Sequence, residues 1–125
     1  MKILIVDDIK GWRDYHSLRV LEVFPEAEII TAESAREGYD MLLEHNEAPF
    51  DIILTDMQME PDFEPKYAGE WFVEQVKSFK NYSTTKLYII SAAYNIEYIA
   101  KMYNVGFIRK STARSFPDVY KSTLI

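Results

Sequence analysis

The sequence predicts an α/β fold: a (βα)5 doubly wound parallel sheet, with helices on both faces forming three layers. Two observations support this prediction. Short apolar runs alternate along the chain with segments whose apolar residues recur at helical spacing. Three of these runs are apolar at nearly every position, as expected for strands that helices cover on both faces. They are residues 2–6, 51–55 and 86–90.

Two shorter runs complete the set of predicted strands. Ile29-Ile30-Thr31 forms the second strand, and residues 105–108 form the fifth. Right-handed crossovers between parallel strands place helices on both faces of the sheet. The common flavodoxin-like strand order, 2-1-3-4-5, is expected, and it sets the first strand beside the third. One domain spanning residues 1–125 fits the chain length.

The helices follow from periodicity and from start and stop signals. The first ends before Pro25, and the second begins at Ser34, which forms a capping box with Glu37. A short last helix is expected to begin at Ser115, with Phe116 on its inner face. The first predicted helix spans residues 11–24, the second runs to about residue 46, and the fourth spans residues 95–103. The third is marked by its apolar residues, Trp71, Phe72, Val76 and Phe79.

Composition excludes several classes of function. The chain has 125 residues and a net charge of −6, which argues against nucleic acid or an anionic membrane as a direct partner. It has no cysteine, so disulfides and thiolate metal sites are excluded. No apolar run reaches the roughly 18 residues of a membrane span, and the N-terminus does not have the pattern of a signal peptide. A cytoplasmic protein is expected.

Polar side chains follow four of the predicted strands. Asp7 and Asp8 follow the first, Asp56 the third and Ser91 the fourth, while Lys110 follows the fifth. Because the carboxyl ends of parallel strands share one edge, these side chains are expected to gather where ligands bind in open α/β sheets. Carboxylates suit Mg²⁺, and an ammonium group suits phosphate. The pattern therefore predicts a site for a divalent cation and a phosphoryl group.

These positions resemble the receiver domain of two-component response regulators, and the resemblance covers the whole chain. The motifs that carry it are Val6-Asp7-Asp8, Thr55-Asp56-Met57-Gln58-Met59, Ser91-Ala92 and Phe107-Ile108-Arg109-Lys110. The resemblance implies that Asp7, Asp8 and Asp56 bind Mg²⁺ together with the backbone carbonyl of Gln58.

The resemblance also implies how the domain is switched. Asp56 would accept a phosphoryl group from a histidine kinase or a phosphotransfer protein. Ser91 and Lys110 would contact the phosphoryl oxygens, and Phe107 would act as a rotamer switch. A downstream protein target, or an output domain outside this chain, would read the change.

Two features depart from the family pattern. Gly69 comes thirteen residues after Asp56, later than in the family, so the loop after the third strand is longer. Ser111 follows Lys110 where the family usually has proline. Tyr94 and Tyr98 lie off the apolar stripe of their helix and are expected to be exposed. His16 and His45 have no matching partners and are not interpreted as metal ligands or phosphorelay histidines.

Two alternatives remain open at this point. The first is a small Mg²⁺-dependent phosphohydrolase that uses aspartyl-phosphate chemistry. Phosphatases of the haloacid dehalogenase type place their second acid two residues after the nucleophile, whereas Asp7 and Asp8 are adjacent here. The second is a pseudo-receiver that folds alike but is never phosphorylated. The longer loop and Ser111 favour it, and the complete set of acids argues against it.

Overall fold

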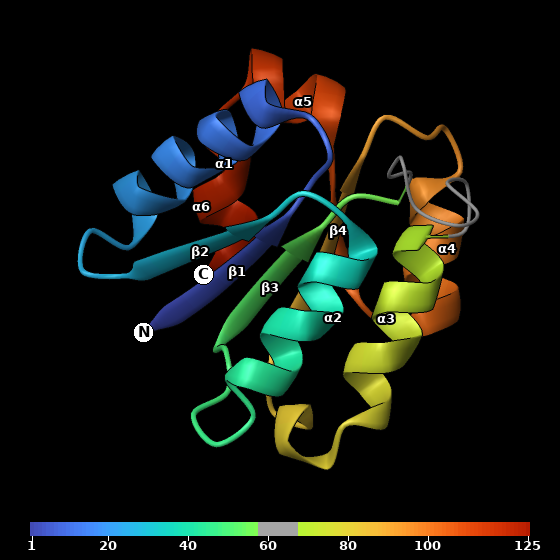
Figure 1. The fold of residues 1–125 in the computed structure, drawn as a ribbon. Coiled ribbons are helices and arrows are strands. Elements are labelled where there is room, and N and C mark those ends of the chain that lie inside the picture. The colour runs from blue at the N-terminus through green and yellow to red at the C-terminus, as the bar shows by residue number, and fades with distance from the viewer. Residues whose placement is uncertain (58–67) are drawn as a thin grey trace.

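The sheet of the computed structural model has five parallel strands in the order β2-β1-β3-β4-β5 (Figure 1), so the predicted fold class and strand order are confirmed. The structure describes residues 1–57 and 68–125. The strands are β1 (Lys2–Val6), β2 (Glu28–Ala32), β3 (Ile52–Thr55), β4 (Lys86–Ser91) and β5 (Gly106–Arg109).

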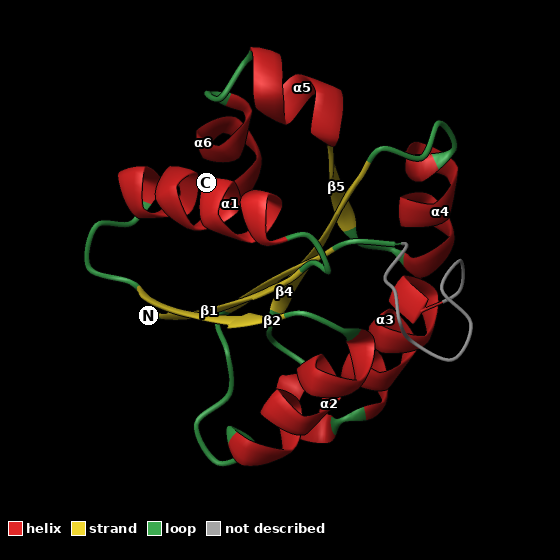
Figure 2. Ribbon diagram, turned by 45° about the horizontal axis from the view of Figure 1, so that its top comes forward, coloured by secondary structure: helices red, strands yellow, loops and turns green. Residues whose placement is uncertain are grey.

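Helices cover both faces of the sheet and make the three layers visible in Figure 2. One face, called here the α1 face, carries α1 (Lys10–Val23), α5 (Lys110–Ser115) and α6 (Val119–Leu124). The other, called the α3 face, carries α2 (Ala35–Glu44), α3 (Ala68–Ser78) and α4 (Ile96–Tyr103), with a 3-10 turn, η2 (Lys80–Tyr82), after α3. No helix within the described ranges is both long and apolar enough to cross a membrane.

Side chains of each strand alternate between two apolar cores. In β1, Leu4 and Val6 face the α3 side, whereas Ile3 and Ile5 face the α1 side. All four are essentially inaccessible to solvent. Each layer of helices therefore packs on its own apolar surface, as expected for a parallel sheet buried on both faces.

The strand register sets the ends of β1 and β3 side by side. Val6 pairs with Thr55, so the residues that follow them, Asp7 and Asp56, leave the sheet at neighbouring points. The backbone continues this pairing, because the amide of Asp56 donates to the carbonyl of Val6 over 2.9 Å. Two acidic side chains are thus brought to one edge by the geometry of the backbone.

Local signals explain the ends of two helices. The Ser34 hydroxyl accepts a 3.0 Å hydrogen bond from the amide of Glu37, which confirms the predicted cap of α2. Helix α4 ends at Asn104, which has a left-handed backbone with φ of 56°. Asparagine tolerates this conformation better than most residues. The turn at Asn104 leads the chain directly into β5.

A short last helix is present, but its predicted start at Ser115 was wrong. Ser115 ends α5, and a separate helix, α6, begins at Val119. Pro117 explains the break, because proline in a helix interior lacks the amide hydrogen and collides with the preceding turn. Phe116, predicted to face inward, is 70% exposed, whereas Tyr120 is fully buried on the α1 face.

Candidate functional site

Three carboxylates predicted from the strand ends gather at the carboxyl edge of the sheet. Asp7, Asp8 and Asp56 each offer an oxygen, and these oxygens lie within 4.8 Å of one another. Asp7 is only 1% exposed and Asp56 only 5%, while Asp8 is partly buried. The Oδ2 atom of Asp7 is buried and faces the Lys110 ammonium. Clustered carboxylate oxygens fit a hard divalent cation.

Lys110 lies between two of these acids. It is the first residue of α5 and is itself buried. Its Nζ atom is 2.9 Å from Asp56 Oδ2 and 3.0 Å from Asp7 Oδ2. The ammonium thus contacts both carboxylates even though Ser111, and not proline, comes next in the chain.

Burial and charge act in opposite directions on these three groups. The pKa of Asp56 is raised overall, mainly because the carboxyl group is buried. The positive charge of Lys110 acts to lower this pKa, whereas the negative charge of Asp7 acts to raise it. Burial also acts to raise the pKa of Asp7, but contacts with His16, the Ile9 amide and Lys110 outweigh it and lower the pKa. Burial acts to lower the pKa of Lys110, yet Asp56 and Asp7 raise it overall.

The backbone around Asp56 is held on both sides. Asp56 Oδ1 accepts a 2.7 Å hydrogen bond from the amide of Met57, and the Met57 carbonyl accepts one of 3.0 Å from the amide of Gly69. The first turn of α3 lies so close that a Cβ atom at Gly69 would collide with the Asp56 carbonyl oxygen and the Met57 Cα. Only glycine fits this approach.

Ser91 and Phe107 lie on the α3 side of the site. Ser91 is buried at the end of β4, and its hydroxyl accepts a 3.1 Å hydrogen bond from the amide of Ala93. Phe107 in β5 is half-buried against the apolar core of the α3 face. The Arg109 guanidinium lies 5.7 Å from the centre of its ring. Both residues belong to strands that contact α4.

Helix α4 and the turn before it present aromatic side chains to solvent. Tyr94 is 92% exposed and Tyr98 is also exposed, as predicted. Met102 is exposed on the same helix.

Some predicted features lie outside the described residues. The carbonyl of Gln58, expected to bind the metal, is among them. Its role stays a prediction.

Sequence reasoning missed His16. This histidine is buried in α1, with Nε2 3.4 Å from Asp7 Oδ2 and Nδ1 2.6 Å from the Tyr120 hydroxyl. A signal was present, because His16 lies one helical turn after Trp12 and one turn before Val20, on the stripe that faces the core. Its partners are distant in sequence, so no local pattern could identify them.

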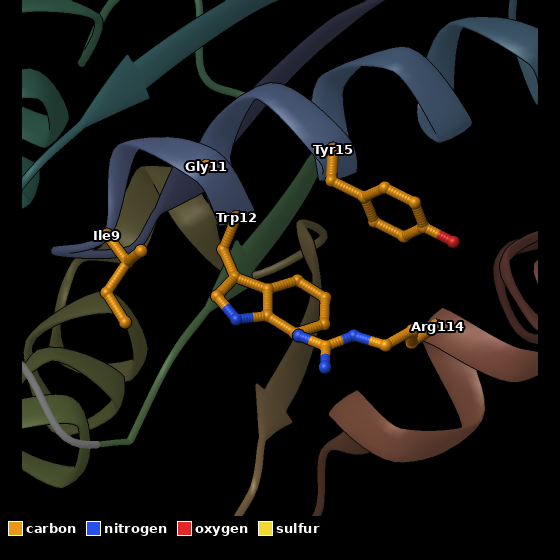
Figure 3. A pocket seen from close by; sticks show the side chains of 5 residues that line it. All are labelled: Ile9, Gly11, Trp12, Tyr15 and Arg114. Carbon is orange, nitrogen blue, oxygen red and sulfur yellow. The ribbon is translucent and has the colours of Figure 1, made fainter.

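A pocket of about 300 Å³ lies between the start of α1 and α5, lined by Ile9, Gly11, Trp12, Tyr15 and Arg114 (Figure 3). The Arg114 guanidinium lies 5.0 Å from the centre of a Trp12 ring, and Lys110 Nζ is also 5.0 Å from it. Cations this close to an aromatic face are attracted to it. Trp12 therefore stands between the pocket and the ammonium group of the site.

Comparison with known proteins was made by sequence and by structure. No protein-family model and no curated protein matches the sequence. The chemotaxis response regulator CheY4 of Vibrio cholerae is 26% identical, with a TM-score of 0.75 over 98% of this chain and 94% of that chain. The signal receiver domain of a DNA-binding response regulator from Colwellia psychrerythraea is 21% identical, with a TM-score of 0.76 over 98% and 94%. The Mn²⁺-bound form of response regulator Rcp1 is 20% identical, with a TM-score of 0.69 over 97% and 87%.

Proposed function

We propose that this chain, which has the fold of a response regulator receiver domain, is a phosphoacceptor switch. Asp56 takes up a phosphoryl group in a Mg²⁺-dependent reaction, and the modified domain changes its contacts with other proteins. One observation carries the proposal: Lys110 Nζ contacts both Asp56 and Asp7 in a buried cluster of three carboxylates. Three carboxylates beside one ammonium carry excess negative charge, which a divalent cation would offset before a phosphoryl group is added.

The metal would be held by Asp7, Asp8 and Asp56, with the Gln58 carbonyl as the further ligand that the family resemblance implies. The gathering of one oxygen from each of the three carboxylates within 4.8 Å of one another supports this assignment. When bound, Mg²⁺ would neutralise charge on the phosphoryl oxygens. The relative that is bound to Mn²⁺, Rcp1, shares the fold.

Asp56 supplies the nucleophile. One carboxylate oxygen attacks the phosphorus of a phosphohistidine, the phosphorus–nitrogen bond breaks, and the imidazole nitrogen keeps the electron pair. Burial raises the pKa of Asp56, and the positive charge of Lys110 opposes this. Lys110 thereby favours the ionised carboxylate that the reaction needs.

Lys110 and Ser91 stabilise the negative charge of the attached phosphoryl group. The ammonium of Lys110 already lies 2.9 Å from Asp56 Oδ2, within reach of an attached phosphoryl group. The Ser91 hydroxyl leaves its contact with the Ala93 amide to donate to a phosphoryl oxygen. The space that it vacates allows Phe107 to turn inward, which shifts a two-state equilibrium of the β4–α4 region.

A histidine kinase or phosphotransfer protein is the proposed donor, and a downstream protein or output domain is the proposed reader. The solved structures that resemble this chain include a chemotaxis response regulator and the receiver domain of a DNA-binding response regulator. We assign the domain a regulatory role and not an enzymatic one. The exposed aromatic residues of the α4 region, Tyr94 and Tyr98, supply apolar contact area for a reader, since aromatic residues are enriched at protein interfaces.

The test uses acetyl phosphate as a small donor. The chain is incubated with acetyl phosphate and MgCl₂, and intact-mass spectrometry follows the addition of one phosphoryl group. The expected result is a single addition that depends on Mg²⁺ and is absent in Asp56→Asn. The matched control is Asp51→Asn, because Asp51 is an exposed acid before β3 at the opposite edge of the sheet.

An addition that survives Asp56→Asn, or no addition at all, would contradict the proposal. Steady turnover of an aryl phosphate above background would favour the hydrolase alternative instead.

A further inference from the structure

We propose that His16 is a positioning residue that holds the Asp7 carboxylate through Nε2–H, in a tautomer that the Tyr120 hydroxyl selects. The inference rests on the proposed function, because Asp7 is one of the residues assigned to the metal. It adds to the site a residue from the middle of α1 and one from the last helix, α6.

The three side chains form a continuous buried line. His16 Nε2 lies 3.4 Å from Asp7 Oδ2, and His16 Nδ1 lies 2.6 Å from the Tyr120 hydroxyl. All three residues are at most 1% exposed. Within the described ranges Nε2 makes no hydrogen bond of ordinary length, and it faces Asp7 Oδ2, which also contacts Lys110 at 3.0 Å. Because an unsatisfied buried donor is costly, the Asp7 carboxylate is the natural partner for Nε2.

The chemistry of the neighbours fixes the tautomer. An ionised carboxylate can only accept hydrogen bonds, so the nitrogen facing Asp7 must carry the hydrogen. In a neutral imidazole the other nitrogen is then an acceptor, and the Tyr120 hydroxyl must donate to Nδ1. Burial, the largest cause, raises the pKa of Tyr120, which keeps this hydroxyl protonated and able to donate.

Aromatic packing holds the imidazole ring in place. Trp12 stacks on His16 with ring centres 5.2 Å apart and planes 26° apart. On the far side, Tyr120 makes a tilted contact with His16 and an edge contact with Tyr15. A ring confined in this way directs Nε2 at one point, as a residue that orients another must do.

Both oxygens of the Asp7 carboxylate therefore have contacts. Oδ1 accepts a 3.0 Å hydrogen bond from the amide of Ile9, whereas Oδ2 faces Lys110 and His16. Lys110 is shared with Asp56, so it will be drawn away from Asp7 when a phosphoryl group arrives. His16 contacts Asp7 and is suited to hold this carboxylate through the whole cycle.

The first test reads the tautomer directly. Nitrogen NMR of the metal-free protein is expected to show His16 protonated at Nε2 and not at Nδ1. Tyr120→Phe keeps the ring packing and removes the donor, so the Nδ1 signal is expected to move to that of an unbonded nitrogen. A His16 that carries a proton on Nδ1, alone or together with one on Nε2, would overturn the proposal.

The second test measures Mg²⁺ binding of His16→Leu, His16→Gln and the parent protein by titration. His16→Leu is expected to raise the dissociation constant roughly tenfold, the lower range for loss of a residue that orients a metal ligand. His16→Gln keeps an amide donor and is expected to recover part of the loss. His45→Gln is the matched control, because His45 contacts Lys2 at the opposite edge of the sheet and should leave the constant unchanged.

Equal Mg²⁺ affinity of His16→Leu and the parent would overturn the positioning role. A parent protein that binds no Mg²⁺ would instead contradict the proposed function. The positioning role would then be tested by the carbon NMR signal of the Asp7 carboxyl group in His16→Gln. A shift of this signal would support the role, and an unchanged signal would overturn it.

Discussion

The two faces of the sheet treat polar groups differently. On the α1 face, a line of polar contacts runs through the core from Tyr120 through His16, Asp7 and Lys110 to Asp56. On the α3 face, the buried hydroxyls of Ser91 and Tyr82 make hydrogen bonds to backbone groups. The Tyr82 hydroxyl on that face donates 2.8 Å to a backbone carbonyl, that of Leu42.

This difference separates two tasks. Side chains that handle charge come from the α1 face, where burial and mutual contact set their ionisation. Ser91 and Phe107, the proposed switch, belong to the α3 face, where packing dominates. Substitutions on the α1 face should therefore change stability in a manner that depends on pH and metal, and substitutions on the α3 face should not.

The largest effect is expected for Phe72→Ala on the α3 face. Phe72 is fully buried, and truncating a core phenylalanine costs about 4 kcal/mol of unfolding free energy. Urea unfolding at pH 5 and pH 7.5 should show the same loss at both values, because no titrating group is removed. A loss that changes strongly with pH would break the comparison between the faces.

Lys110→Met is expected to cost about 3 kcal/mol at neutral pH, since it leaves Asp7 and Asp56 buried without their cation. Both carboxylates then have higher pKa values in the folded state, so the folded protein binds more protons. The loss should shrink as pH falls toward the unfolded carboxyl value of about 3.9. Urea unfolding between pH 4 and pH 7.5 measures this.

Lys101→Met is the control for Lys110→Met. Lys101 pairs with Glu97 on the surface of α4, and both side chains are exposed. An exposed pair of this kind contributes little, so no pH-dependent loss is expected. If the loss of unfolding free energy varied with pH in the same way for both variants, burial of Lys110 would not be the cause of the pH dependence.

Ser91→Ala tests the switch side of the site. The hydroxyl holds the Ala93 amide over 3.1 Å, and its removal is expected to cost about 1 kcal/mol. Mg²⁺ affinity should stay within about twofold of the parent, because Ser91 is not among the acids gathered at the edge. Calorimetric titration measures the Mg²⁺ affinity. A tenfold change in this affinity would show that Ser91 on the α3 face affects metal binding, against the proposed separation of the two faces.

The smallest effect is expected for Asp56→Asn without metal. Since the pKa of Asp56 is raised in the folded state, its charge destabilises the fold above that pKa, and the penalty disappears as pH falls below the unfolded value. The variant should therefore have a higher urea midpoint than the parent at pH 7. The difference should vanish near pH 3.5, and a lower midpoint at pH 7 would contradict the assigned direction.

The sequence predicted the features that the backbone of a parallel sheet determines. Asp7, Asp56 and Lys110 could be placed together because each directly follows an apolar run, and the ends of parallel strands converge. The acids and Lys110 do gather. Their functional roles remain predictions, and the proposed role of the Gln58 carbonyl lies outside the described residues.

Features that depend on contacts between distant segments could not be read from local patterns. His16 and Tyr120 are 104 positions apart, and nothing in the pattern of α1 indicates which residue faces the imidazole. The last helix was misplaced for a different reason. A capping pattern at Ser115 competes with Pro117, and the pattern does not reveal that α5 already begins at Lys110.

The approach of Gly69 to Met57 has an evolutionary consequence. A hydrogen bond between these residues closes the chain at the base of the segment 58–67, so Asp56 is anchored whatever the number of residues in between. The entropic free-energy cost of closing a loop rises only slowly with its length, by about 0.6 kcal/mol for each doubling. Insertions and deletions can therefore accumulate at this point, beside the proposed phosphoacceptor, and lineages can acquire new recognition sequences there while Asp56 stays in place.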